Sequence, residues 1–143
     1  MAVAELLAPR PGERVLDLAA APGGKATHLA SLMQGQGLLV ANEIHPQRAW
    51  ELAGNLERWG ARNVAITVET PERLAERLPG FFDAVLLDAP CSGEGMMRKG
   101  EAARREWAPE LVRGCALRQT AILEHAARLV RPGGRLAYAT CTF

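Results

Sequence analysis

Short apolar runs alternate with longer helical patterns along the chain, and this alternation limits the possible folds more than any other feature. The apolar runs lie at residues 14–18, 38–42, 64–68, 84–88 and 135–141. Short, nearly continuous apolar runs are typical of strands buried on both faces of a parallel sheet. Helical patterns occupy about residues 24–33, 46–59, 71–78 and 109–130, and the turn Arg131-Pro132-Gly133-Gly134 follows the last. The sequence therefore predicts an α/β fold, a doubly wound and mostly parallel sheet with right-handed crossovers.

Length and composition restrict the class of protein. The 143 residues predict one domain, residues 1–143, with ordinary proportions of apolar (48%) and charged (23%) residues. No apolar run approaches the roughly 20 residues of a membrane span, and no signal peptide is visible, so we expect a cytoplasmic protein without membrane contact. Three cysteines without a CxxC pair predict neither a disulfide scaffold nor a metal site. The net charge of +1 gives no hint of nucleic-acid binding, which usually requires a basic excess.

The first apolar run leads into a segment rich in small residues, Asp17-Leu18-Ala19-Ala20-Ala21-Pro22-Gly23-Gly24-Lys25. In doubly wound sheets, ligands bind at the carboxyl ends of the strands, near the point where the strand order reverses. Small residues let the backbone approach a ligand, and Gly23-Gly24 opens a helix whose free N–H groups face the same place. The segment matches neither the GxGxxG fingerprint nor a phosphate loop, which argues against NAD and ATP. The alternative is a glycine-rich turn that serves packing only.

The second apolar run ends at Asn42-Glu43. An acidic residue at the tip of the second strand is placed to accept hydrogen bonds from ribose hydroxyls. The alternative is a solvated charge at a strand end. Together with the small-residue segment, Glu43 indicates a cofactor that contains adenosine but no pyrophosphate, and S-adenosylmethionine is the candidate.

Two cysteines stand where the last two apolar runs end, Cys91 in Pro90-Cys91 just after the fourth run and Cys141 in Thr140-Cys141 at the end of the fifth, so we expect them at neighbouring strand ends. Carbon-5 of cytosine is too weak a nucleophile to take a methyl group directly. A thiolate that adds to carbon-6 makes the ring an enamine; after methyl transfer a base removes the carbon-5 proton and the thiol leaves. Asp88 is the candidate to face the ring nitrogen and amino group. The residues alone do not say which cysteine attacks, and a buried, unreactive cysteine is the alternative, which we accept for Cys115.

The sequence resembles the Sun/Nop family of RNA 5-methylcytosine methyltransferases over essentially its whole length. The resemblance rests on residues 16–25, on Leu87-Asp88-Ala89-Pro90-Cys91-Ser92, on Arg131-Pro132-Gly133-Gly134 and on Tyr138-Ala139-Thr140-Cys141-Thr142. Residues 92–99 and Ala41-Asn42-Glu43 are most similar to the bacterial RsmF-type branch, which modifies 16S ribosomal RNA.

The resemblance implies a class I, Rossmann-like S-adenosylmethionine-dependent methyltransferase that acts on RNA and not on DNA. It implies that Cys141 is the nucleophile and that Cys91 assists product release, the reverse of DNA cytosine methyltransferases. The cofactor would be held by Ala19, Ala20, Ala21, Pro22, Gly23, Gly24, Lys25, Glu43 and Asp88, with Asp88 between cofactor and base. One position departs from the family pattern: an aspartate usually contacts the adenine amino group where Thr70 stands here. Thr70 is kept among the expected cofactor-binding residues, and Glu69 or a backbone group is the alternative adenine contact.

Family members also continue beyond the Thr-Cys strand and carry an RNA-binding region before the first strand. We therefore expect a catalytic core truncated after the fifth strand, whose missing parts would explain the low net charge. The alternatives are a cofactor-binding fragment with little activity alone, an enzyme that acts on tRNA, and a small-molecule methyltransferase, which would leave both cysteine motifs unexplained. Arg98 and Lys99 are either phosphate contacts or solvated charges. Trp50 and Trp59 are expected in the core or at its boundary. Trp107 is expected to be buried against the last helix, with stacking on a base as the alternative. The oligomeric state stays open.

Overall fold

Five parallel strands form one sheet, in the order β3-β2-β1-β4-β5, in a computed structural model that describes residues 2–91 and 109–140. The strands are β1 (Arg14–Asp17), β2 (Leu38–Asn42), β3 (Val64–Thr67), β4 (Phe82–Asp88) and β5 (Val130–Ala139). The helices are α1 (Ala2–Leu7), α2 (Gly24–Met33), α3 (Pro46–Trp59), α4 (Pro71–Arg77) and α6 (Pro109–Leu129). The predicted doubly wound sheet is confirmed, and its strand order reverses at β1, which pairs with β2 on one edge and β4 on the other.

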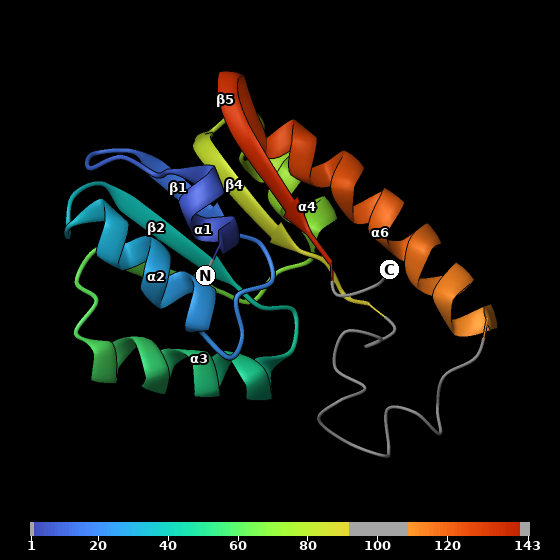
Figure 1. The fold of residues 1–143 in the computed structure, drawn as a ribbon, viewed down its shortest axis with the longest axis horizontal. Helices are drawn as coiled ribbons and strands as arrows, with labels where there is room; N and C mark the ends of the chain where they lie inside the picture. Colours follow the sequence, from blue (N-terminus) through green and yellow to red (C-terminus); the bar gives the residue numbers. More distant parts are fainter. Residues whose placement is uncertain (1, 92–108, 141–143) are drawn as a thin grey trace.

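Helices cover both faces of the sheet (Figure 1). Helices α1, α2 and α3 pack on one face and bury Val15 of β1, whereas α4 and α6 pack on the other and bury Leu16. Successive side chains of a strand point to opposite faces, so a strand covered on both faces must be apolar at nearly every position. This explains the continuous apolar runs of the sequence. None of the helices in the described ranges is long and apolar enough to cross a membrane.

The sequence-based prediction was wrong about where β5 begins. Pairing with β4 starts at Val130, opposite Phe82, and resumes with Arg135 opposite Ala84, so the predicted turn at 131–134 bulges out within the strand. Gly134 makes the bulge possible, because a Cβ atom there would lie 2.9 Å from the carbonyl oxygen of Asp83. Helix α1 was not predicted, since six residues are too few to show a helical period.

The expectation that Trp50 and Trp59 lie in the core or at its boundary is also wrong. Their exposed fractions are 79% and 60%. The buried face of α3 consists of Ala49, Leu52 and Leu56, which recur at three- and four-residue spacing. Trp107 lies outside the described residues.

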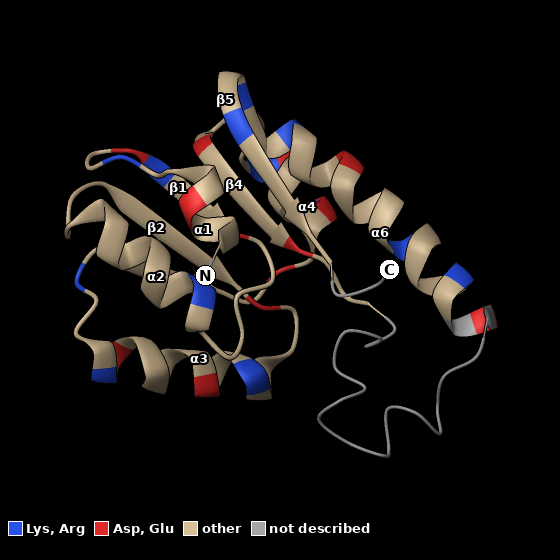
Figure 2. Ribbon diagram, in the orientation of Figure 1, with Lys and Arg blue, Asp and Glu red and all other residues tan. Residues whose placement is uncertain are grey.

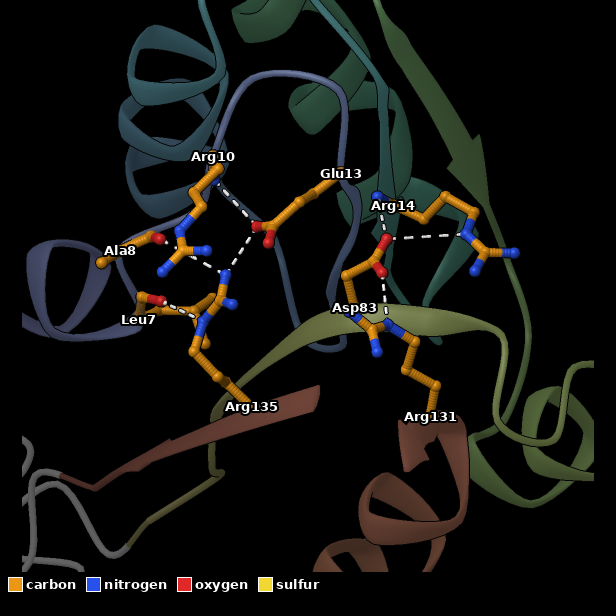
Figure 3. A network of polar contacts seen from close by, with 8 residues as sticks. All are labelled: Leu7, Ala8, Arg10, Glu13, Arg14, Asp83, Arg131 and Arg135. Atoms are coloured by element: carbon orange, nitrogen blue, oxygen red, sulfur yellow. Dashed lines mark hydrogen bonds and ion pairs between the residues drawn. The ribbon is translucent and has the colours of Figure 1, made fainter. Parts of the chain in front are cut away.

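A network of charged side chains ties the strands together at the end of the sheet opposite the carboxyl ends (Figure 3). Asp83 of β4 accepts hydrogen bonds from the backbone N–H of Arg14, at 2.7 Å, and from Nε of Arg131, at 2.5 Å. Arg135 of β5 donates to Glu13 and to the carbonyl oxygen of Leu7 at the end of α1. These contacts join segments more than 40 residues apart, so they are specific to the tertiary structure.

The Asp83 carboxylate should therefore contribute measurably to stability. We expect Asp83→Ala to lower the free energy of unfolding by about 1–3 kcal/mol, because it removes the acceptor of the part-buried Arg14 amide and of the Arg131 guanidinium. The hydrogen bond from the Arg14 amide is the main cause that lowers the pKa of Asp83, with Arg131 assisting. The contribution is thus present above about pH 4 and disappears as pH falls through the lowered pKa. Urea denaturation at pH 7 and pH 3 measures both effects, with exposed Glu124→Ala as the control. A loss for Asp83→Ala as small as that of the control would contradict this role.

The core contains one carboxyl group with an unusual environment, that of Asp17 at the end of β1. It is fully buried, and neither oxygen has a hydrogen-bond partner of good geometry among the described residues. Burial raises the pKa of Asp17 to about 7. The Lys25 ammonium and the Ala19 amide oppose this rise, and Asp88 and Glu43 add to it. The folded protein therefore holds Asp17 protonated at mildly acidic pH.

A folded pKa above the unfolded value means that the folded state binds the proton more tightly, so stability falls as pH rises from about 4 to above 7. Asp17→Asn removes this titration. We expect the unfolding free energy of Asp17→Asn, relative to the unmodified chain, to increase by roughly 3 kcal/mol between pH 5 and pH 8.5. Urea denaturation across this range measures it. Parallel pH profiles of the two proteins would show that Asp17 does not titrate in the folded state as described.

Candidate active site at the carboxyl ends of the strands

A cleft of about 500 Å³ opens at the carboxyl ends of β1, β2 and β4, a volume typical of small-molecule sites. Helix α6 and the start of α3 supply further walls. Its lining consists of Leu18, Ala19, Ala21, Asn42, Glu43, Ile44, His45, Arg48, Pro71, Leu87, Asp88, Ala89, Pro90, Cys91, Arg118 and Ile122. The cleft lies where the strand order reverses, as predicted for a ligand site.

The segment after β1 runs along one side of the cleft. Ala19 and Ala21 line it, and Ala20 is buried beneath, where its N–H donates to the carbonyl oxygen of Asn42 at 2.8 Å. Gly23 caps α2 with φ of 115° and leaves room for Leu52, which a Cβ atom would approach to 3.2 Å. Small side chains and positive φ thus let the chain turn tightly from the strand into the helix.

Contacts with α3 hold the backbone of this segment. Arg48 donates to the carbonyl oxygen of Ala21 at 3.2 Å, and Asn55 donates to that of Pro22 at 2.6 Å. Of the residues predicted to hold the cofactor, Pro22, Gly23 and Gly24 do not line the cleft in the described part of the chain. The segment therefore meets the cleft through Leu18, Ala19 and Ala21 and meets α3 through its later residues.

Asn42 joins three strand ends through its buried amide. Its Nδ2 donates to the carbonyl oxygens of Leu18, at 3.2 Å, and Glu69, at 2.9 Å. Its Oδ1 accepts from the Thr67 hydroxyl at 2.8 Å and from the Glu69 amide at 3.2 Å. This amide uses its full hydrogen-bonding capacity, so the segments after β1 and β3 are fixed relative to β2.

Glu43 is held at the cleft wall. Its side chain is 3% exposed, so it is not the solvated charge that the sequence left as an alternative. The backbone N–H of His45 donates to Oε1 at 3.0 Å, and Nη1 of Arg48 lies 3.4 Å from Oε2. A buried carboxylate with these few partners has acceptor capacity left for a ligand in the cleft.

Lys25 and Asp88 form an ion pair between the start of α2 and the end of β4. Nζ of Lys25 lies 2.5 Å from Oδ2 of Asp88, and both side chains are partly exposed. Asp88 lines the cleft, whereas Lys25 reaches it only through this contact. The pair orients the Asp88 carboxylate beside the cleft.

Cys91 lines the same cleft as Asp88 and Glu43, after the end of β4. Cys141, the second predicted catalytic cysteine, lies outside the described residues, as do Arg98 and Lys99. Cys115 is buried on α6, as predicted. The structure thus brings Cys91, Asp88 and Glu43 to one cleft and leaves the position of Cys141 undescribed.

Thr70, predicted near the adenine, caps helix α4 in the structure. The Thr70 hydroxyl accepts a hydrogen bond from the Arg73 amide at 3.3 Å and caps α4. The Glu69 carboxylate pairs with Arg73 and Arg77, at 3.3 Å each. Pro71 lines the cleft beside them, so the contact of either residue with an adenine stays a prediction.

Sequence reasoning missed several lining residues, among them Arg48 and Arg118. Arg48 follows Glu43 by five residues, a spacing that could have drawn attention to it. Arg118 gave no signal, because only the packing of α6 against the sheet decides which of its residues face the cleft. Figure 2 shows basic and acidic residues on both helical layers, in keeping with the net charge of +1.

Comparisons with known proteins agree with this geometry. The family model described as "16S rRNA methyltransferase RsmB/F" matches residues 4–143. The ribosomal RNA small subunit methyltransferase F of Vibrio vulnificus is 49% identical over 130 residues, which cover 91% of this chain and 28% of that protein. The enzyme of the same name from Aeromonas hydrophila is 49% identical over 128 residues, covering 90% of this chain and 27% of that protein. The chain thus spans less than a third of the length of these curated relatives.

Solved structures share the fold. The crystal structure of PH0851 matches with a TM-score of 0.95 and 40% identity, covering 99% of this chain and 32% of that one. NSun6 from Pyrococcus horikoshii, solved with SFG, matches with a TM-score of 0.88 and 31% identity, covering 99% and 36%. A SAM-dependent O-methyltransferase from Thermotoga maritima matches with a TM-score of 0.64 and 22% identity, covering 95% of this chain and 41% of that one. At this identity the match supports only the class I methyltransferase fold. Since the family model spans nearly the whole chain, the chain belongs to the 16S rRNA methyltransferase RsmB/F family.

Proposed function

We propose that the chain is the S-adenosylmethionine-binding catalytic core of an enzyme that methylates carbon-5 of cytosine in RNA, with 16S ribosomal RNA as the substrate. One observation carries the proposal: in a member of the RsmB/F family, a single cleft is lined by Glu43 at one side and by Asp88 and Cys91 at the other. The curated relatives are named as small subunit ribosomal RNA methyltransferases. The cytoplasmic location predicted from the sequence stays a prediction.

The residues present suit this cofactor. The buried Glu43 carboxylate can accept hydrogen bonds from two ribose hydroxyls, and Ala19 and Ala21 leave room for a nucleoside against the backbone. NSun6, a structural relative, was solved with SFG, an analogue of S-adenosylmethionine. When bound, the cofactor would supply an electrophilic methyl group on a positively charged sulfur.

The remaining residues would act on the base. Cys141 adds as a thiolate to carbon-6 of cytosine, and carbon-5 becomes nucleophilic and takes the methyl group. Loss of the carbon-5 proton to a base then breaks the bond between sulfur and carbon-6, assisted by Cys91. The Asp88 carboxylate, oriented by Lys25, would accept a hydrogen bond from the exocyclic amino group of the ring.

A second candidate is a cofactor-binding unit that needs further protein for catalysis. The observation that favours it is the share of the relatives that the chain covers, 28% and 27%. Phosphate contacts supply much of the affinity for nucleic acid, and the net charge of +1 offers few of them. The isolated chain would then bind the cofactor but methylate RNA poorly. A separate alternative is that the substrate is tRNA, which methylation of tRNA in place of ribosomal RNA would show.

Cofactor binding is the first test. We expect calorimetry to detect binding of S-adenosylmethionine to the chain and Glu43→Ala to weaken it at least tenfold, because the ribose hydroxyls would lose a buried acceptor. Glu51→Ala, at an exposed position of the neighbouring helix α3, is the matched control and should bind normally. No detectable binding at millimolar cofactor would exclude the assignment.

The order of the two cysteines is the second test. In the longest natural protein that contains this sequence, Cys91→Ala should accumulate a covalent adduct with RNA, because release of the product is impaired. The adduct should be absent from the Cys91→Ala, Cys141→Ala double variant and unaffected by Cys115→Ala. Denaturing electrophoresis with labelled RNA measures it. An adduct that needs Cys91 and survives Cys141→Ala would reverse the two roles.

A further inference from the structure

Gln119 of α6 connects the ends of β4 and β5 beside the cleft. Its Nε2 donates to the carbonyl oxygen of Pro90 at 2.7 Å and to the Thr140 hydroxyl at 3.4 Å. Its Oε1 accepts from the Tyr138 hydroxyl at 2.9 Å. One half-buried amide thus uses both of its N–H groups and its oxygen on two neighbouring strands.

These bonds lie just beyond the last backbone bond between the two strands that the described residues contain. The last backbone bond between them in the described residues runs from the Ala89 N–H to the Ala139 carbonyl oxygen, at 2.8 Å. Pro90 has no N–H to donate, and its carbonyl oxygen accepts from the side chain of Gln119.

The contacted positions directly precede the two cysteine positions. Pro90 is followed by Cys91, which lines the cleft, and Thr140 is followed in sequence by Cys141. The neighbours of Gln119 on α6, Arg118 and Ile122, line the cleft themselves. The bridge thus lies directly beside the cleft, which it meets through Pro90.

We propose that Gln119 is a positioning residue that sets the separation of the Pro90–Cys91 segment from the end of β5. The inference rests on the proposed function, because the separation matters only if both cysteines act on one base. Reactions between positioned groups are sensitive to small displacements, and about 1 Å can cost 100-fold in rate. The hydrogen bonds of Gln119 in the described part of the chain go to Pro90, Tyr138 and Thr140 and not to Glu43 or Asp88, so we expect cofactor binding to be independent of it.

The test compares three variants in the longest natural protein that contains this sequence. Gln119→Leu keeps a side chain of similar size and removes all three hydrogen bonds. Tyr138→Phe removes only the bond to Oε1. Thr120→Ala, the next residue on the same helix, loses only a bond to its own helix at the Ala116 carbonyl oxygen and is the matched control.

Two main measurements, supplemented by kcat and KM, distinguish a positioning role of Gln119 from a role in folding. The first is the rate of adduct formation with RNA that contains 5-fluorocytosine, in which carbon-5 has no proton to lose and the thioether to carbon-6 persists. The second is the Kd of S-adenosylmethionine by calorimetry. We expect Gln119→Leu to slow adduct formation at least tenfold and lower kcat by a similar factor, with KM for RNA and the cofactor Kd changed less than about twofold. Tyr138→Phe should show a smaller loss and Thr120→Ala none.

The failures are distinguishable. If the unmodified protein forms no adduct, the proposed function fails, and the role of Gln119 fails with it. If the unmodified protein forms the adduct and Gln119→Leu forms it equally fast, only the assignment of Gln119 is overturned. A parallel loss of cofactor binding or a large drop in the unfolding temperature of Gln119→Leu would also overturn it, because the residue would then serve general stability.

Discussion

Strand β1 is the constraint on which the rest of the structure depends. It is paired on both edges, with β2 and β4, and Val15, Leu16 and Asp17 are fully buried. A slip of one residue in its register would exchange Val15 and Leu16 between the two helical layers, so the register is strongly specified. Because the register is fixed, the segment after β1 always emerges between the ends of β2 and β4. That is where the cleft forms.

The carboxylates at the two ends of the sheet have different surroundings. At one end Asp83 and Glu13 are satisfied by arginines from distant segments, and these contacts hold the strands and α1 together (Figure 3). At the carboxyl ends, Glu43 and Asp88 keep free acceptor capacity toward a cleft. The carboxylates of the first end join distant segments of the chain, whereas those of the second end line a cleft.

Much of the site could be read from the sequence, because its residues sit at positions that the alternation of strand and helix defines. Asp88 is the last residue of β4 and Glu43 directly follows β2, so the sequence pattern predicts both at the ligand end of the sheet, where they line the cleft. Gln119 and Arg118 could not be found this way, since their importance depends on which face of α6 meets β4 and β5. The exposure of Trp50 was missed for a related reason: residue type suggested burial, but the position on α3 decided it.

The sequence by itself determined the alternation of the five strands with helices α2, α3, α4 and α6 along the chain, the strand ends that carry polar residues, and the family. Periodicity and motif spacing are local properties of the chain, so they can be read from the sequence alone. Only the tertiary structure decided that the turn at 131–134 is a bulge opposite Asp83, that Lys25 pairs with Asp88, and that one amide bridges β4 and β5. These contacts join residues 19 to 63 positions apart, and such pairings depend on how the layers pack and not on any local pattern.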